Sequence, residues 1–190
     1  YQFPVKSIPS GKHTFYILPI IAGNMPKAGN LLKFELWVDV DYPIINQLQP
    51  QPAAIIKDNK IPISCVLYDI DSGLDLVSTS MAINNKAAYF NYDVKSQLLK
   101  YKPDQLAEGK NTIMLRAYDK VGNYVVKAWD FIVDTQSPTG SVLINNGEKT
   151  THSAYVNLNI KAEETVSGIK NIYASNDGVF DTELKQPLTY

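Results

Sequence analysis

The chain is poor in several residue types, and each scarcity argues against a class of protein. Among 190 residues there is one cysteine, Cys65, so the disulfide that joins the two sheets of an antibody-type sandwich cannot form. Arg116 is the one arginine, the net charge is −1 and no basic run occurs, whereas nucleic-acid binding normally needs clustered Lys and Arg. No apolar stretch approaches the roughly 20 residues of a membrane span. We therefore expect neither nucleic-acid binding nor membrane insertion.

Catalytic motifs are missing as well. The sequence has no phosphate-binding glycine loop, no H-E-x-x-H and no cysteine pair for zinc. Residues 78–82, STSMA, resemble the nucleophile motif of subtilisin-like proteases, but Ser78 replaces its glycine and the segment alternates as a strand. A triad needs a base within hydrogen-bond reach, and His13 is followed by Thr14 rather than by the glycine of that family. We expect no catalytic residue, and we interpret Cys65 as a small buried apolar side chain.

The periodicity that is present has a period of two. Apolar and polar residues alternate in segments such as NTIMLRAY (111–118) and YVNLNIKA (155–162), and turn signals such as DIDSG and DKVGN separate them. This pattern predicts antiparallel strands near 53–57, 61–68, 76–84, 88–95, 97–102, 111–118 and 124–133. The predicted core consists of Ile63, Cys65, Leu67, Ile113, Leu115, Ala117, Trp129, Phe131 and Val133.

An internal repeat divides the chain. WVDVDYP ends at Pro43 and IVDTQSP ends at Pro138, which gives a repeat of about 95 residues. Both segments are interpreted as last strands that run into linkers, where proline stops strand pairing. We therefore predict closing strands of a first module in residues 1–42, a complete sandwich in 43–137, and opening strands of a third module in 138–190. Two or three strands cannot bury a sandwich core alone, so the chain is expected to be an excerpt of a longer protein or to be completed by other chain.

These motifs resemble those of a known group of proteins. The D-S-G-L-D loop, the L-A-E-G-K-N-T segment, the D-K-V-G-N hairpin and the W-D-F-I-V-D-T-Q-S-P exit look like bacterial cell-surface immunoglobulin-like repeats. Residues 8–43 are similar to the fibronectin type III-like modules of lactocepin-type subtilisin-like cell-envelope proteases. The resemblance implies an all-β fold of tandem antiparallel immunoglobulin-like β-sandwiches, in an extracellular or cell-surface protein. Such modules accompany proteases, glycosidases and adhesins alike, so the fold implies no single function.

Three hypotheses about function follow. The first is a non-catalytic spacer or accessory region of a secreted or cell-surface bacterial protein, whose partners are neighbouring modules of the same polypeptide. The second is a carbohydrate- or protein-binding (adhesin) module, with a cell-wall glycan or a host protein as its partner. The third is the C-terminal accessory region of a large subtilisin-like serine protease. A binding module should show an exposed aromatic patch with convergent polar groups, and a spacer should not.

Aromatic residues offer the one candidate patch for such binding. Trp129 shares a strand face with Phe131, so it is predicted to lie in the core, and Trp37 is given the same interpretation in the first module. In AAYFNYDV, either Tyr89 with Asn91 or Phe90 with Tyr92 faces outward.

Acidic residues suggest a cation site. In the predicted topology, the loops YDIDSGLD and YDKVGN and the linker DVDYP all lie at one end of the central sandwich. Calcium prefers six to eight oxygen ligands from flexible loops, and no other cofactor is expected. The expected calcium ligands are Asp41, Asp69, Asp71 and Asp119. The competing interpretation is that each Asp caps the backbone of its own turn.

Overall fold

The structure is a computed structural model, and it describes residues 8–19, 31–175 and 177–180. The predicted all-β class is confirmed. The described residues form the following elements: β1 (Gly11–Ile17), β2 (Leu32–Val38), β3 (Ile44–Gln49), β4 (Ile55–Ile56), β5 (Ile63–Tyr68), β6 (Leu74–Ile83), β7 (Lys86–Ala88), β8 (Asn91–Asp93), β9 (Leu98–Tyr101), β10 (Gly109–Asp119), β11 (Tyr124–Val133), β12 (Thr139–Ile144), the short 3-10 helix η2 (Asn145–Gly147) and β13 (Leu158–Glu163). No helix in this described part is long and apolar enough to cross a bilayer.

The chain divides into two compact units. Of the described residues, the first unit comprises 8–19, 31–52, 62–103 and 112–129, and the second comprises 53–61, 104–111, 130–175 and 177–180. The first unit therefore contains β1 to β3, β5 to β9 and most of β10 and β11. The second contains β4, the ends of the two long strands, and β12 and β13.

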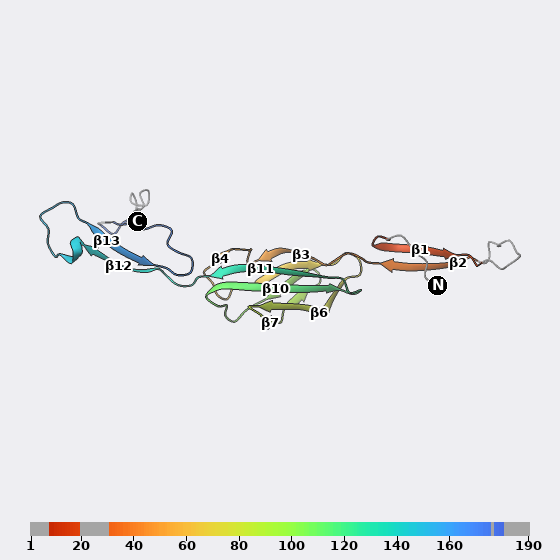
Figure 1. The fold of residues 1–190 in the computed structure, drawn as a ribbon. Coiled ribbons are helices and arrows are strands. Elements are labelled where there is room, and N and C mark those ends of the chain that lie inside the picture. The colour runs from red at the N-terminus through yellow and green to blue at the C-terminus, as the bar shows by residue number, and fades with distance from the viewer. Residues whose placement is uncertain (1–7, 20–30, 176, 181–190) are drawn as a thin grey trace. The chain divides into compact units, whose positions relative to one another are not determined.

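Two larger sheets hold all nine described strands between residues 44 and 133, β3 to β11. One has four strands in the order β3-β5-β9-β8, and the other has five in the order β4-β11-β10-β6-β7. Figure 1 shows β4, β11 and β10 of the second sheet side by side. Along β5 and β10, every second side chain is buried, as alternation on a strand with one inward face requires. All nine predicted core residues are buried, each at most 5% exposed. The predicted register of these strands is confirmed, because a slip by one residue would have exposed them.

Three details of the strand prediction were wrong. β3 was missed because its alternation is broken by an irregularity between Asn46 and Gln49, where Gln47 has a φ of 51°. The predicted strand 88–95 is two short strands, since β7 pairs in the five-stranded sheet and β8 in the four-stranded one. The predicted strand 53–57 contains only the two residues of β4, which run parallel to the end of β11.

Hydrogen bonds, an ion pair and strand pairing stabilise the second unit locally. Glu108 accepts hydrogen bonds from the Thr135 backbone N–H and hydroxyl, both at 2.9 Å. Lys110 forms an ion pair with Asp130 at 2.9 Å. β12 and β13 form an antiparallel pair, in which Val142 lies opposite Ile160.

Trp37 does not lie in a core, contrary to the prediction. In the antiparallel β1–β2 pair it lies opposite Lys12 and on the same face as Glu35, which forms ion pairs with Lys12 at 2.6 Å and Lys33 at 2.8 Å. Trp37 is 70% exposed. The repeat spacing matches Trp37 to Ile132, whose neighbours in sequence point inward, so the assignment was wrong by one position on the strand.

Candidate functional site

The loop between β10 and β11 is organised around Asp119. This carboxylate is 2% exposed, and its Oδ1 accepts backbone N–H groups from Val121, Gly122 and Asn123 at 3.0, 2.7 and 2.8 Å. Its Oδ2 accepts the Asn123 side-chain amide at 2.7 Å. Asp followed by Gly-Asn is favourable here because Gly122 has a φ of 99°, which other residues rarely adopt. Asp119 thus caps its own turn.

The loop between β5 and β6 uses Asp69 in the same way. Its Oδ1 accepts the backbone N–H groups of Asp71 at 3.2 Å and Gly73 at 2.7 Å. The Gly73 carbonyl accepts the Lys120 backbone N–H at 2.9 Å, which connects this loop to the β10–β11 loop. Two acidic turns are therefore held side by side by a backbone hydrogen bond.

The linker after β2 is fastened to both turns through Asp39. Asp39 Oδ2 accepts the Ser72 backbone N–H at 3.0 Å, and its backbone carbonyl accepts the Asn123 side-chain amide at 3.2 Å. Its Oδ1 accepts the backbone N–H of Asp41 at 3.0 Å. The linker is thus connected to the β5–β6 loop and to the β10–β11 loop. We name the group Asp39, Asp41, Asp69, Asp71 and Asp119 the acidic junction.

The acidic junction contains two groups of carboxylates that could hold a metal ion. Asp39, Asp41 and Asp71 have ligand oxygens within 4.8 Å of one another, and so do Asp39, Asp69 and Asp119. All four predicted ligands therefore lie in the junction, but they belong to two triplets rather than one. Asp39, which is common to both triplets, was not among the expected ligands.

Electrostatics distinguish the members of the junction. Asp71 is exposed, and partial desolvation together with the charges of Asp39, Asp41 and Asp69 raises its pKa. Burial acts to raise the pKa of Asp39, but hydrogen bonds donated by Ser72 and Asp41 outweigh it and lower that pKa. A carboxylate whose pKa is raised by like charges is one whose ionised form a bound cation would stabilise.

The carboxylate oxygens of the acidic junction are suitable ligands for calcium, but only some of them are free to coordinate an ion. Asp119 accepts four hydrogen bonds and Asp69 accepts two, so both already serve their turns. Among the described residues, the carboxylates of Asp41 and Asp71 accept no hydrogen bond. Calcium needs six to eight oxygens, and exposed Asp41 and Asp71 leave room for water ligands. The first triplet is therefore the one with free coordination capacity.

Asp75 lies at the start of β6, directly after the acidic β5–β6 loop, and its carboxylate serves another purpose. It accepts the backbone N–H groups of Val77 at 3.0 Å and Ser78 at 3.2 Å. The Ser78 hydroxyl, followed by these N–H groups, lowers its pKa. Asp75 thus stabilises the start of β6 and is in neither triplet.

A second candidate is an aromatic groove beside β6 and β7. Tyr89 is 90% exposed and Val77 97% exposed, and both line a hollow of about 490 Å³ together with Phe90, Asn91 and Tyr92. Of the two alternatives for this segment, the structure therefore has Tyr89 and Asn91 facing outward. Tyr92 instead donates its hydroxyl to the Leu67 carbonyl at 2.7 Å.

No family model matches the chain, and no curated protein does. Among solved structures, CopC from Methylosinus trichosporium OB3b is similar, with 15% identity and a TM-score of 0.41, over 48% of this chain and 93% of CopC. Dimeric latent PorU from Porphyromonas gingivalis is also similar, with 12% identity and a TM-score of 0.41. That match covers 82% of this chain and 22% of PorU, so the chain spans about a fifth of PorU. Likenesses this low carry no argument about function.

Sequence reasoning missed the central position of Asp39, although a signal for it exists. In DVDYP, Asp39 is the first of two acids that flank Val40, and the structure uses this acid to accept the Ser72 N–H. Asp39 directly follows β2, and Asp134 directly follows β11. Asp134 is buried at 8% exposure and its Oδ1 accepts the Gln136 N–H. An acid directly after each of these strands was thus a recognisable sequence feature.

Proposed function

We propose that this chain is a set of non-catalytic, tandem immunoglobulin-like modules that form a spacer or accessory region of a secreted or cell-surface bacterial protein. The observation that supports the proposal is that hydrogen bonds attach the linker after β2 to two loops of the adjacent sheets. Asp39 is hydrogen-bonded to Ser72 and Asn123, residues of two different loops, so the linker is attached rather than free. A spacer that sets distance and orientation needs attached linkers of this kind, because a free linker would let its neighbours reorient.

The proposal includes calcium as a second fastener. Asp41 is in the linker and Asp71 is in the β5–β6 loop, so an ion between them would crosslink the linker to the sandwich. It would also offset the repulsion that raises the Asp71 pKa. Asp69 and Asp119 would keep their capping hydrogen bonds and contribute mainly negative potential. Calcium is a stiffening ligand in this proposal, and no chemical step depends on it.

Spin-label distances test the spacer proposal directly. Cysteines at exposed Thr14 and Lys100 would report the geometry across the linker, and buried Cys65 will label little because burial raises its pKa to about 12. We expect a narrow distance distribution in the wild-type background, narrowed further by calcium, and a broad one in Asp39→Ala. An equally broad distribution in wild type and Asp39→Ala would contradict a spacer with an attached linker. A narrow distribution that calcium and chelator leave unchanged would contradict only the metal.

The aromatic groove supports a second candidate function, a carbohydrate- or protein-binding module. Exposed tyrosine beside an amide side chain is an arrangement that can stack on a sugar ring and hydrogen-bond to it. Tyr89 and Asn91 provide it at the β7–β8 corner. Attachment to a subtilisin-like protease is a compatible setting for either function.

Binding to a glycan array tests this alternative with a matched control. Tyr89→Ala should abolish any binding, and Tyr155→Ala should not, because Tyr155 is equally exposed at 89% but lies outside the groove. Equal loss in both variants, or no wild-type binding at micromolar concentration, would exclude the groove as a binding site.

A further inference from the structure

Two apolar sheet faces remain half-exposed within the described residues. The β1–β2 pair places all its larger apolar side chains except Tyr16 and Trp37 on one face, which we call the N-terminal face: Phe15, Ile17, Leu32, Phe34, Leu36 and Val38. The β12–β13 pair places all its apolar side chains except Leu143 on the C-terminal face: Val142, Ile144, Leu158, Ile160 and Ala162. Phe34 and Leu36 are 51% and 52% exposed, and Leu158 is 41% exposed. Each face thus has the apolar pattern of a core-facing side of a sheet, but its side chains are not buried.

The repeat shows what covers such faces. Phe15 and Ile17 match Ile113 and Leu115 of β10, and Phe34 matches Trp129 of β11. These three counterparts are buried, at no more than 5% exposure.

The C-terminal face has buried counterparts in the other sheet. Leu158, Ile160 and Ala162 match Ile63, Cys65 and Leu67 of β5. Those β5 residues are at most 1% exposed, and β5 belongs to the four-stranded sheet, whereas β10 belongs to the five-stranded one. The N-terminal and C-terminal faces therefore correspond to the two opposite halves of one sandwich.

We propose that the C-terminal face of one copy of this chain packs against the N-terminal face of a second copy, so that two chains together complete a sandwich. The β12–β13 pair would supply the half that contains β3 and β5 in the central module, and the β1–β2 pair would supply the half that contains β10 and β11. The inference goes beyond the spacer proposal, because it assigns a partner to surfaces that a spacer does not explain.

The area available is sufficient for association. Half-exposed Phe, Leu and Ile side chains still present roughly 80 Å² each, so the two faces would together remove on the order of 1,000 Å² from water. That value is near the lower limit of a specific interface, so self-association is expected in the micromolar range. Exposed apolar sheet faces of this kind are unfavourable in water, so burying them against each other supplies the driving force for association.

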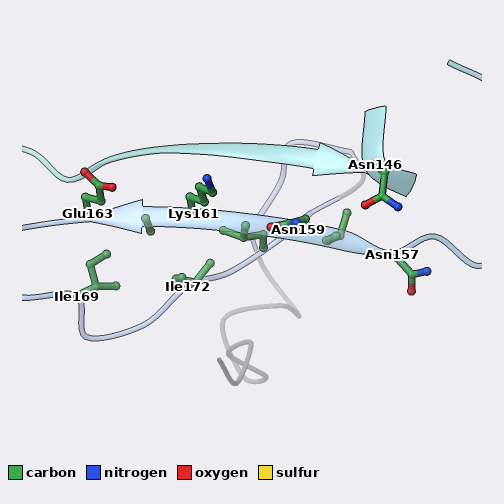
Figure 2. A pocket seen from close by; sticks show the side chains of 10 residues that line it. Asn146, Asn157, Asn159, Lys161, Glu163, Ile169 and Ile172 are labelled. Carbon is green, nitrogen blue, oxygen red and sulfur yellow. The ribbon is translucent and has the colours of Figure 1, made fainter. Parts of the chain in front are cut away.

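The C-terminal face also has space beside it. A hollow of about 960 Å³ lies along β13, bounded by Ile160, Ala162, Ile169 and Ile172 among others, and a hollow of about 560 Å³ adjoins Val142 and Ile144. Figure 2 shows Ile169 and Ile172 pointing toward β13 from the segment that follows it. In the central module the equivalent β5 residues lie in a filled core. The hollows are where inserted apolar side chains of a partner would fit.

Such packing would be heterologous, since one copy uses its β12–β13 pair and the other its β1–β2 pair. Heterologous contacts leave an unused face at each end, so they extend into chains of copies instead of stopping at a dimer. This property makes the proposal testable by complementation. Leu36→Glu blocks only the N-terminal face, and Leu158→Glu blocks only the C-terminal face.

Sedimentation velocity of the whole 190-residue chain is the test. We expect wild type to form concentration-dependent oligomers, each single variant to be monomeric, and an equimolar mixture of the two variants to form a dimer and nothing larger. Trp37→Glu and Asn159→Glu are matched controls on the opposite faces of the same strands, and they should oligomerise like wild type. Near-ultraviolet circular dichroism of buried Trp129 confirms that the central module of each variant is folded.

Any of four sedimentation results would overturn the proposal: wild type that stays monomeric at about 100 µM, single variants that still associate, a mixture that stays monomeric, or control variants that lose association. A compact monomer whose two faces are protected at every concentration would show that the faces cover each other within one chain. That result would also overturn it.

Discussion

Replacing Asp119 with alanine should destabilise the central sandwich more than any other single loop substitution in the acidic junction. The side chain is buried and accepts four hydrogen bonds, three of them from consecutive backbone N–H groups of the β10–β11 loop. Hydrogen bonds to a charged acceptor are worth about 1.5–3 kcal/mol each, but they are not additive and the alanine variant lets water reach part of the loop. We expect a loss of about 3 kcal/mol in the free energy of unfolding.

Asp119→Asn separates the two effects of this carboxylate. The amide oxygen can still accept backbone N–H groups, whereas the charge that repels Asp39 and Asp69 is removed. If capping dominates, the Asn variant should lose about 1 kcal/mol, well short of the alanine variant. If repulsion dominates, the Asn variant should instead be more stable than wild type.

Urea unfolding monitored by Trp129 fluorescence measures these differences. A Trp37→Phe background removes the exposed tryptophan, so the signal reports the sandwich that contains Trp129. Asp93→Ala is the control, because Asp93 is exposed and its carboxylate accepts the Lys95 N–H at 2.9 Å in an outer turn. The control should lose much less stability than Asp119→Ala, because water replaces the hydrogen bond at this exposed turn. The reasoning is refuted if Asp119→Ala and Asp93→Ala differ by less than about 0.5 kcal/mol.

Three further predictions concern single ionisable groups. Burial raises the pKa of Cys65 to about 12, so a thiol reagent at pH 8 should react with it only after denaturant is added, and stoichiometric reaction of the native protein would contradict its burial. Desolvation and like charges raise the pKa of Asp71, so the folded state binds its proton more tightly than the unfolded state does. Without calcium, the stability of the fold should therefore rise as pH falls through that pKa. Asp71→Asn should raise the melting temperature at pH 7, and an unchanged melting temperature would contradict the proposed repulsion. The Val166 N–H, followed by those of Gly168 and Ser167, lowers the pKa of Glu164. The Glu164 carboxylate should therefore hold its loop ordered at neutral pH, and this order should be lost as pH falls through the lowered pKa. Amide NMR shifts of Gly168 should follow this titration in wild type and not in Glu164→Gln.

Strand faces within the central module were predictable because alternation is a local property of the sequence. A buried side chain every second residue requires only that one face be apolar; β5 and β10 satisfy this along their length, and β11 does so from Trp129 to Val133. β3 lacked this signal since Gln47 breaks its register, and the division of 88–95 depended on which sheet each half joins. Pairing partners are set by distant residues, so no local pattern contained them.

The acidic junction could be predicted only in part. Topology alone brings the linker and two loops to one end of a sandwich, and the named acids are indeed close together. Which of these acids caps its own turn and which connects the linker was not predictable, because it depends on which backbone N–H groups each turn presents. Asp119 and Asp69 serve their own turns as the competing interpretation held, whereas Asp39 connects the linker to Ser72.

The turn at Glu164 shows that capping and cation binding are separable. Glu164 takes the place of Asp69, and its carboxylate accepts the backbone N–H groups of Val166, Ser167 and Gly168, as an acid before a Ser-Gly turn should. The position that matches Asp71 is Val166, so the cap is kept there without the second acid. A cap requires one carboxylate, and crosslinking a linker requires at least one more on each side. Among the described loops, the pairing of Asp41 with Asp71 therefore distinguishes the acidic junction as the candidate cation site. The capping chemistry does not, because the turns at Asp69 and at Glu164 share it.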